Sequence, residues 1–427
     1  MADLQFTNVR IIDGSGAEPF DGSVLLRGNR IAKVAKAAEA LEAAPDGGAE
    51  VVDGGGATLM PGLIEPHAHI SFCDTPDLES LGDIPPEEHT LKTMKYARKM
   101  LDQGFTAIFS AAAAKPRLDI VIRDAIEAGD IPGPRMRAAS PELTPTSGLG
   151  DVRRWHMHRE TFAMTCDGAE EFRKVAREMV REGVDTLKMN PSGDEFIPFA
   201  RAHQTIMNEA ETAAVCEVGH SRGKKIAAHA RSALSVKLCA KHGAQVLYHC
   251  TLSDAEALDM LEAKKDEVFV APTAGMAYVT SIGEGRDYGI DADHPVAKFF
   301  AAELETGARN MNELKRRGVR VLPGGDYGFA WNPIGTNARD MEHFVNLLDF
   351  TPLEAIRAAT QYSGELFGEA IGLVREGYLA DLLLVDGDPS KDIRILQDAD
   401  RLLAIMKDGA FHKAPVGGAG AGRVAAE

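Results

Sequence analysis

Apolar and polar positions change their rhythm along the chain. Residues 4–58 alternate short apolar runs with Gly, Asp and Asn, which is the pattern of short strands joined by turns. From residue 59, short β-rich runs alternate with longer segments of helical period, which indicates parallel strands joined by crossover helices. After one more helical segment at 351–368, strand-like sequence returns in "LADLLLVDG" and "LLAIMKDG". The β blocks at the two chain ends are expected to pair with each other.

Eight β-rich runs lie in the central region, and eight is the number that closes a (β/α)8 barrel. The runs are "GLIEPHAH", "FTAIFSAA", "RMRAAS", "DTLKMN", "KIAAHA", "QVLYHC", "VFVAPT" and "RVLPGGD". Helices are expected between them at 87–102, 169–181, 208–221, 233–242, 254–263 and 296–317. We therefore predict an α/β fold: a (β/α)8 TIM barrel over 59–369, with a small β-sandwich domain formed by both chain ends, 1–58 plus 370–427.

Side chains able to bind a metal fall at the ends of several of these runs. Catalytic groups of a (β/α)8 barrel come from the C-terminal ends of its strands, which converge on one open mouth. His67 and His69 end the first run, and because residues i and i+2 of a strand point the same way, both should face that mouth. Later runs carry the remaining candidates, Lys188, His229, His249 and Asp326.

Imidazole and carboxylate groups together suit zinc and similar divalent ions. Such a site can leave a position for water, whose pKa the metal lowers to about 7. One H-x-H pair, or one histidine on an apolar strand, would more often be structural. Four histidines, a lysine and an aspartate at corresponding strand ends favour a metal centre.

Composition narrows the class of protein. Hydrophobic residues make up 44% of the chain and charged residues 26%, as is common in globular proteins. A net charge of −17 opposes binding to nucleic acids and to acidic membrane surfaces. No apolar run approaches the roughly 18 residues of a membrane span, and the five scattered cysteines indicate free thiols in a reducing compartment. We therefore expect a cytoplasmic protein.

Six motifs resemble the metal-dependent amidohydrolase superfamily in its carboxylated-lysine form, over nearly the whole chain. They are "MPGLIEPHAH", "TLKMN", "AAHARS", "LYHC", "PGGDYG" and "ADLLLVDGDP". The resemblance implies two divalent ions, most often zinc, with His67, His69 and Asp326 on the more buried ion and His229 and His249 on the more exposed one.

The same resemblance gives two of these residues a further role. It implies that Lys188 takes up carbon dioxide and bridges the two ions as a carbamate. It also implies that metal-activated water attacks the scissile carbonyl while Asp326 carries a proton to the leaving amine. Two departures from the family pattern stand out: Glu65 replaces the more usual Asp, and Leu149 stands where dipeptidase-like relatives often carry His.

The substrate is less clearly marked. Within the superfamily the sequence is most similar to the imidazolonepropionase-like and prolidase-like group, which includes phenylurea and carbamate hydrolases. Tyr327, Phe329 and Trp331 follow the eighth run, where they would either line a pocket for an apolar or aromatic substrate or pack the loop under the last helix. Arg231 should point the same way as His229, where it would bind a substrate carboxylate, polarise a carbonyl or form a structural salt bridge.

A second H-x-H pair, His156 and His158, lies in the segment 153–160. Its position outside the strand ends favours a mobile substrate-facing loop or a solvated surface over a metal site.

The leading hypothesis is a metal-dependent hydrolase of a carbonyl C–N bond in a small amide, urea or carbamate. An Xaa-Pro or Xaa-amino-acid dipeptidase is the near alternative. A deaminase on the same barrel is a second class, against which the lysine of "TLKMN" argues, and a non-catalytic scaffold is a third. A homo-oligomer is expected by analogy with the family.

Overall fold

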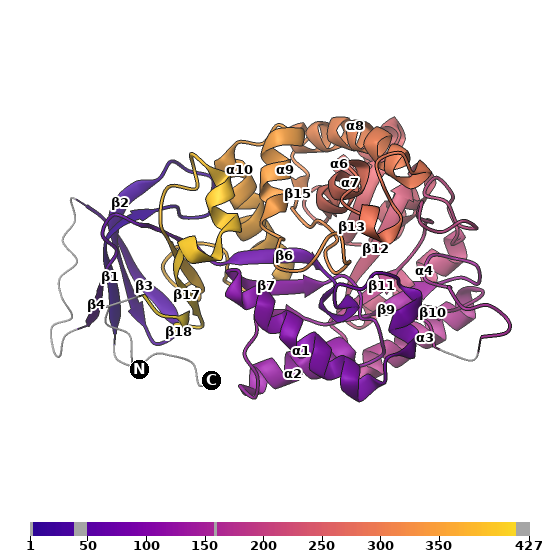
Figure 1. Ribbon diagram of the computed structural model, residues 1–427, viewed down its shortest axis with the longest axis horizontal. Helices are drawn as coiled ribbons and strands as arrows, with labels where there is room; N and C mark the ends of the chain where they lie inside the picture. Colours follow the sequence, from indigo (N-terminus) through magenta and orange to yellow (C-terminus); the bar gives the residue numbers. More distant parts are fainter. Residues whose placement is uncertain (1–2, 38–48, 158–159, 416–427) are drawn as a thin grey trace.

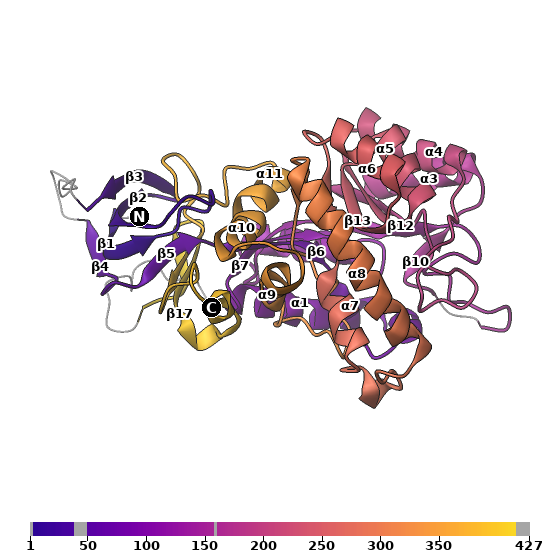
Figure 2. The same ribbon diagram turned by 90° about the horizontal axis from the view of Figure 1, so that it is seen from above.

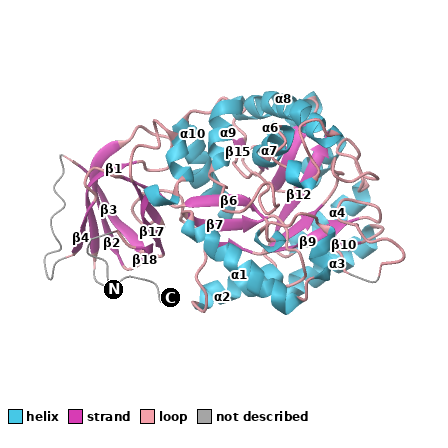
Figure 3. Cartoon of the chain, in the orientation of Figure 1, coloured by secondary structure: helices cyan, strands magenta, loops and turns pink. Residues whose placement is uncertain are grey.

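The computed structural model describes residues 3–37, 49–157 and 160–415. Figure 1 shows two regions side by side: a β-sheet at one end of the molecule and a larger α/β region at the other. Figure 2, seen from above, shows the same division, and Figure 3 shows that helices surround the strands of the α/β region.

The sheet at one end, called here the end sheet, contains strands from both ends of the chain. Its order is β18-β17-β16-β5-β1-β2-β3, with β4 also paired to β1. The strands are β1 (Leu4–Ile11), β2 (Phe20–Arg27), β3 (Arg30–Lys36), β4 (Glu50–Asp53), β5 (Thr58–Pro61), β16 (Leu382–Val385), β17 (Leu402–Lys407) and β18 (Ala410–Lys413). The two chain ends meet where β5 pairs antiparallel with β16.

An apolar core holds the end sheet together. Phe6 of β1 contacts Phe411 of β18 edge to face, with ring centroids 6.3 Å apart, although three strands separate β1 from β18 in the sheet order. The sheet therefore curves over on itself and encloses a core to which both chain ends contribute.

The α/β region contains parallel strands in every run where a strand was expected. The strands are β6 (Leu63–Ala68), β7 (Phe105–Ser110), β8 (Arg135–Arg137), β9 (Ala139–Thr144), β10 (Ala163–Thr165), β11 (Thr186–Met189), β12 (Lys225–Ser232), β13 (Val246–Leu252), β14 (Phe269–Ala271) and β15 (Arg320–Val321). They form a sheet β6-β7-β8 and a sheet β10-β9-β11-β12-β13-β14-β15. The prediction of an α/β fold with parallel strands is confirmed.

Two details of these strands differ from the prediction. The third run is divided between β8 and β9, and β10 was not expected. The two sheets approach each other where Ala68, at the end of β6, forms an isolated parallel bridge with Tyr327.

The helices alternate with the strands. They are α1 (Pro86–Asp102), α2 (Leu118–Ala128), α3 (Ala169–Glu182), α4 (Glu209–Ser221), α5 (Ala233–His242), α6 (Ala255–Ala263), α7 (Ala274–Ser281), α8 (Pro295–Arg316), α9 (Arg339–Leu347), α10 (Pro352–Arg357) and α11 (Ser363–Phe367). The six helices expected between the runs are present, whereas α2, α7 and α9 were missed.

Local capping chemistry explains why several helix starts could be predicted. Asn208 and Thr351 form capping boxes with Glu211 and Glu354, which satisfy the first free N–H groups of α4 and α10. The last expected helix is present but contains a π-helical turn, Ala358–Tyr362, between α10 and α11.

Two further expectations concern the cysteines and the helices. All five cysteines are free thiols, as predicted. Among the described residues, none of the helices combines the length and apolar character needed to cross a membrane.

Candidate active site

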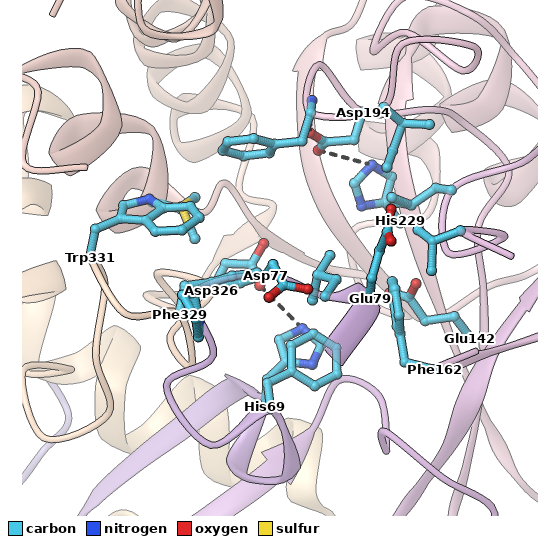
Figure 4. A pocket seen from close by; sticks show the side chains of 18 of the residues that line it. His69, Asp77, Glu79, Glu142, Phe162, Asp194, His229, Asp326, Phe329 and Trp331 are labelled. Atoms are coloured by element: carbon cyan, nitrogen blue, oxygen red, sulfur yellow. Dashed lines mark hydrogen bonds and ion pairs between the residues drawn. The ribbon is translucent and has the colours of Figure 1, made fainter. Parts of the chain in front are cut away.

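The predicted ligands of the more buried ion meet at the C-terminal end of β6. The ligand atoms of His67, His69 and Asp326 all lie within 4.8 Å of one another. Oδ1 of Asp326 is 3.2 Å from Nε2 of His69 and 3.6 Å from Nε2 of His67. Figure 4 shows His69 and Asp326 turned toward each other at the base of a cavity.

Two contacts fix the orientation of His69. Its Nδ1 donates to the carbonyl oxygen of Ala112 at 3.4 Å, and its Nε2 lies 3.2 Å from Oδ1 of Asp326. In metal sites the second imidazole nitrogen commonly donates to a carbonyl in this way, which leaves the other nitrogen to bind the ion. Nε2 of His69 and the Asp326 carboxylate are thus placed to share a cation.

The predicted ligands of the second ion show the same arrangement. Nδ1 of His229 and Nε2 of His249 are 2.9 Å apart. The other nitrogen of His229 donates to the Gly193 carbonyl at 3.1 Å. The other nitrogen of His249 is hydrogen-bonded to Oγ1 of Thr273 at 2.6 Å. Both rings are therefore held from behind with one nitrogen each turned to the same place, which suits a shared cation.

Lys188 lies beside these ligands and is almost fully buried, with 1% of its surface exposed. Its Nζ is 3.6 Å from Oε1 of Glu142 and 5.0 Å from the centre of the Tyr248 ring. Glu142 of β9 is also held by Asn190, whose Nδ2 donates to Oε2 at 2.8 Å. A lysine in this position can lose its proton readily because burial disfavours its charged form.

Burial sets the direction of the pKa shifts in this cluster. It lowers the pKa of His67, His229 and His249 well below the usual imidazole value, and it lowers the pKa of Lys188. Burial acts to raise the pKa of Asp326, but the nearby His67 and His69 outweigh it and hold that pKa well below its usual range. Burial therefore favours the neutral form of His67, His229 and His249, and the Asp326 carboxylate stays ionised, which are the forms that bind metals.

Strained backbone positions occur at the same strand ends. His249 has φ +73°, Thr273 has φ +61° and Asp326 has φ +60°, although none is a glycine. Such conformations cost free energy and persist where the surrounding structure enforces them, often at functional sites.

Glu65 anchors the first ligand strand from behind. Its Oε1 accepts the backbone N–H of His67 at 2.9 Å, and its Oε2 accepts Nδ2 of Asn337 at 2.8 Å. Burial raises the pKa of Glu65 to about 8. Gly324 lies against the same strand, where an added Cβ would stand 2.7 Å from Cβ of His67, so the "PGGD" motif needs its first glycine for close approach.

A cavity of about 290 Å³ opens over the ligand cluster. His67, His69, Lys188, His229 and Asp326 line one part of it. Apolar side chains dominate the remaining wall, among them Phe72, Phe162, Phe196, Met276, Phe329 and Trp331.

Aromatic contacts run outward from the ligand cluster. The rings of His69 and Phe72 are stacked with centroids 4.2 Å apart, Phe72 contacts Phe329 at 5.8 Å, and Phe329 contacts Trp331 at 5.6 Å. The wall can therefore accept a planar apolar group next to the ligands. Tyr327 points elsewhere: among the described residues it is not part of the cavity wall, and it packs in the core beside Gly275 and Gly325.

Arg231 lines the cavity but is engaged by acidic partners. Its Nε donates to Oδ2 of Asp194 at 2.9 Å, and its Nη1 donates to both carboxylate oxygens of Glu303 at 2.7 Å. Burial acts to lower the pKa of Arg231, but these two carboxylates raise it above its usual value. The salt-bridge alternative considered for Arg231 is thus present in the structure.

Three acidic residues near the site were not singled out from the sequence. Glu142 lies two residues beyond the end of the third run, Asp194 lies four residues beyond the fourth, and Glu303 lies inside a helix. The first two could have been found by extending the search past the strand ends.

Of the second H-x-H pair, His156 is exposed on a turn, and His158 lies outside the described residues.

The donor set fits two divalent cations. His67, His69 and Asp326 offer one group of ligands, and His229 and His249 offer another. Nδ1 of His67 has no hydrogen-bond partner among the described residues, so its ring is held mainly by stacking on Tyr248.

Comparison with known proteins agrees with this geometry. Residues 58–411 match the model of the amidohydrolase family. The chain is 24% identical over 380 residues to ochratoxinase of Aspergillus niger, covering 84% of this chain and 76% of that one. It is 25% identical over 408 residues to imidazolonepropionase of Rubrobacter xylanophilus, covering 91% and 90%.

Solved structures show the same fold. A crystal structure of an amidohydrolase superposes with a TM-score of 0.84 at 25% identity, over 97% of this chain and 100% of that chain. A Xaa-Pro dipeptidase with bound methionine superposes with a TM-score of 0.82 at 22% identity, over 97% and 100%.

Proposed function

The chain belongs to the amidohydrolase family and is a hydrolase of C–N bonds, and on this premise we propose that it cleaves a carbonyl C–N bond in a small amide, urea or carbamate. The substrate carries an apolar or aromatic group, which the wall containing Phe72, Phe329 and Trp331 would hold.

We also propose that the parallel strands close into a (β/α)8 barrel over 59–369, with residues 1–58 and 370–427 as a separate β domain.

The observation that carries the proposal is the convergence of ligand atoms at the strand ends. Nε2 of His69 lies 3.2 Å from Oδ1 of Asp326, and Nδ1 of His229 lies 2.9 Å from Nε2 of His249. We propose zinc ions at both places. Zinc ions would activate water and polarise the substrate carbonyl, as they do in other hydrolases.

Lys188 completes the proposed centre as a bridging carbamate. Its neutral Nζ would form a bond to the carbon of carbon dioxide, one C–O π bond would open, and the nitrogen would release a proton to solvent. The result is a carboxylate with two oxygens on a side chain that previously had none. Burial of Lys188 favours the neutral amine that this step needs.

Asp326 is proposed to move the proton during hydrolysis. Its Oδ1 faces the ligand cluster and its carboxylate is ionised, so it can accept a proton from the attacking water. Delivery of the same proton to the leaving nitrogen would release the amine.

The first experiment identifies the product and the metal together. Protein produced with added zinc and bicarbonate is incubated with aryl amides, phenylureas, carbamates, Xaa-Pro dipeptides and aminated heterocycles, and the products are resolved by mass spectrometry. Release of an amine with an acid or carbon dioxide is expected. Ammonia released only from a ring would establish the deaminase alternative, and cleavage of Xaa-Pro dipeptides alone would establish the dipeptidase.

Lys188 is tested separately by carbon-13 NMR after growth in labelled bicarbonate. The intact protein should show a carbamate carbon and about two zinc ions per chain. Lys188→Met should lose both the signal and most of the activity, whereas Lys241→Met, at an exposed lysine paired with Glu209, should keep them. A fully active Lys188→Met enzyme would contradict the bridging role.

The cytoplasmic location and the homo-oligomer stay predictions.

A further inference from the structure

The position of Arg231 bears on the charge of the substrate. Arg231 is the residue of the cavity wall best suited to hold a carboxylate, because guanidinium binds carboxylates through two parallel N–H donors. Among the described residues of the wall, Arg231 and Lys188 are the only Lys or Arg side chains. Lys188 lies in the ligand cluster beside Glu142. Away from the ligand cluster, Arg231 is therefore the side chain of the described wall that could pair with a substrate carboxylate.

Both two-donor faces of Arg231 are already partly occupied. One face consists of Nε and Nη2, and Nε donates to Asp194 at 2.9 Å. The other consists of Nη1 and Nη2, and Nη1 donates to both oxygens of Glu303 at 2.7 Å. No complete pair of donors is left for a third carboxylate.

Glu303 is held firmly in this position. It lies on α8, is 3% exposed, and accepts a further hydrogen bond from Oγ1 of Thr251 at 2.5 Å. Arg231 is equally buried and lies over the Phe300 ring, 5.3 Å from its centre. Two carboxylates thus surround one guanidinium group, so Arg231 offers no unmatched positive charge.

We infer, on the basis of the proposed function, that Glu303 is a specificity-determining residue that makes the enzyme reject substrates with a carboxylate beside the scissile bond. Such a carboxylate would lose its hydration beside Arg231 without gaining a free pair of guanidinium donors, and it would lie near the Asp194 carboxylate, which lines the same cavity. A neutral carboxamide or ring in the same place loses less hydration and is not repelled by a carboxylate. A neutral carbonyl there needs only one donor, and an N–H of Nη2 can provide it. The substrates are thus amides, ureas or carbamates that are uncharged at this end.

The test uses pairs of compounds that differ only in this charge. N-benzoylglycine is compared with N-benzoylglycinamide, N-acetylphenylalanine with its amide, and N-phenylcarbamoylglycine with its amide. In each pair that is hydrolysed, kcat/KM of the neutral member should exceed that of the carboxylate by about tenfold or more. Equal values, or a preference for the carboxylate, would overturn the inference.

Each compound is also tested as a competitor during hydrolysis of whichever neutral substrate the wider panel yields. The carboxamide should compete more strongly than the carboxylate. The opposite order counts against the inference even if neither compound is hydrolysed.

Glu303→Gln shows whether this residue is responsible. Glutamine removes the negative charge and has one oxygen in place of two to accept hydrogen bonds from Nη1 of Arg231. Arg231 can then pair with a substrate carboxylate, so the ratio of carboxylate to carboxamide kcat/KM should rise about tenfold. Glu305→Gln, at an exposed position two residues further along α8, is the matched control and should leave the ratio unchanged. An unchanged ratio in a folded Glu303→Gln enzyme would refute the role of Glu303. Mere loss of packing would lower both rates together and leave the ratio where it was.

Failure of the inference differs from failure of the proposed function. If metal-loaded protein cleaves no C–N bond in any compound, the proposed function is wrong. If it cleaves such bonds but prefers the carboxylate members, the proposed function stands and the specificity is wrong. The comparison of wild-type rates decides this even if Glu303→Gln does not fold.

Discussion

Strands β1 and β12 are both eight residues long, and they bury very different side chains. β1 belongs to the end sheet and contributes Leu4, Phe6 and Ile11 to an apolar core. β12 buries His229 and Arg231, each of which needs specific polar partners. Burying a polar group without a partner is costly, whereas apolar burial is favourable by itself. The end sheet is thus built for stability, and the strand ends of the α/β region are built around a charge cluster.

Backbone strain adds to this contrast. Among the described residues of the end sheet, the non-glycine residues with positive φ are Asn8 and Asp408, which lie at a register shift and at a turn. The α/β region has positive φ at connecting positions too, such as Asp349 just after α9, and in addition at His249 and Asp326 of the ligand cluster. Of these two regions, the α/β region is the one where such strain coincides with candidate functional residues.

The largest expected effect comes from changing the ligand cluster. Asp326→Asn keeps the size of the side chain but removes the charge and the proton acceptor, so kcat should fall about 10³-fold. Steady-state kinetics with bound zinc measured in the same sample checks this. Asp349→Asn, at an exposed aspartate that also has positive φ, is the matched control. A kcat within tenfold of wild type at full metal content would exclude the proposed role.

A change in the core of the end sheet should lower stability and leave catalysis unchanged. Phe6→Ala removes a buried ring from the core and should lower the free energy of unfolding by about 3–5 kcal/mol. Calorimetry measures the stability, and kcat/KM per folded, metal-loaded molecule should not change. Val51→Ala, at a residue of β4 that is 49% exposed, should have little effect. Loss of activity at constant metal content would show that the end sheet shapes the site.

A smaller effect is expected on the apolar wall. Trp331→Ala removes a ring from the cavity, so KM for an aromatic substrate should rise about tenfold, with a smaller change in kcat. Tyr327→Phe is the control, because Tyr327 packs in the core beside Gly275, and KM should stay within about twofold. Equal effects of both changes would place the substrate elsewhere.

The smallest effect is expected from a surface ion pair of the end sheet. Arg27 donates from Nε to Oδ2 of Asp3 at 3.1 Å, and its side chain is 61% exposed. Arg27→Met should cost less than about 1 kcal/mol of stability, and the difference should shrink in high salt. Chemical denaturation at two salt concentrations measures both. A large, salt-independent loss would mean that this pair behaves like the buried pair of Arg231 and Glu303.

Much of the fold followed from sequence pattern because the signals are local. Alternation between apolar and polar positions identified the strands of both chain ends, and the capping residues Asn208 and Thr351 marked where two helices begin. Helices α2 and α7 were missed because they begin at Arg117 and Thr273, which have positive φ and supply no side-chain cap.

The sequence by itself determined which chemistry is available: His67, His69, Lys188, His229, His249 and Asp326 stand at strand ends because of their spacing and residue type. Only the tertiary structure decided how they face one another, since the partners of His229 and His249 come from the loops after β11 and β14. The charge of the cavity was decided in the same way. Glu303 looks like an ordinary helical glutamate in the sequence, and packing of α8 against β13 brings it to Arg231, where it neutralises the cation that a substrate would otherwise use.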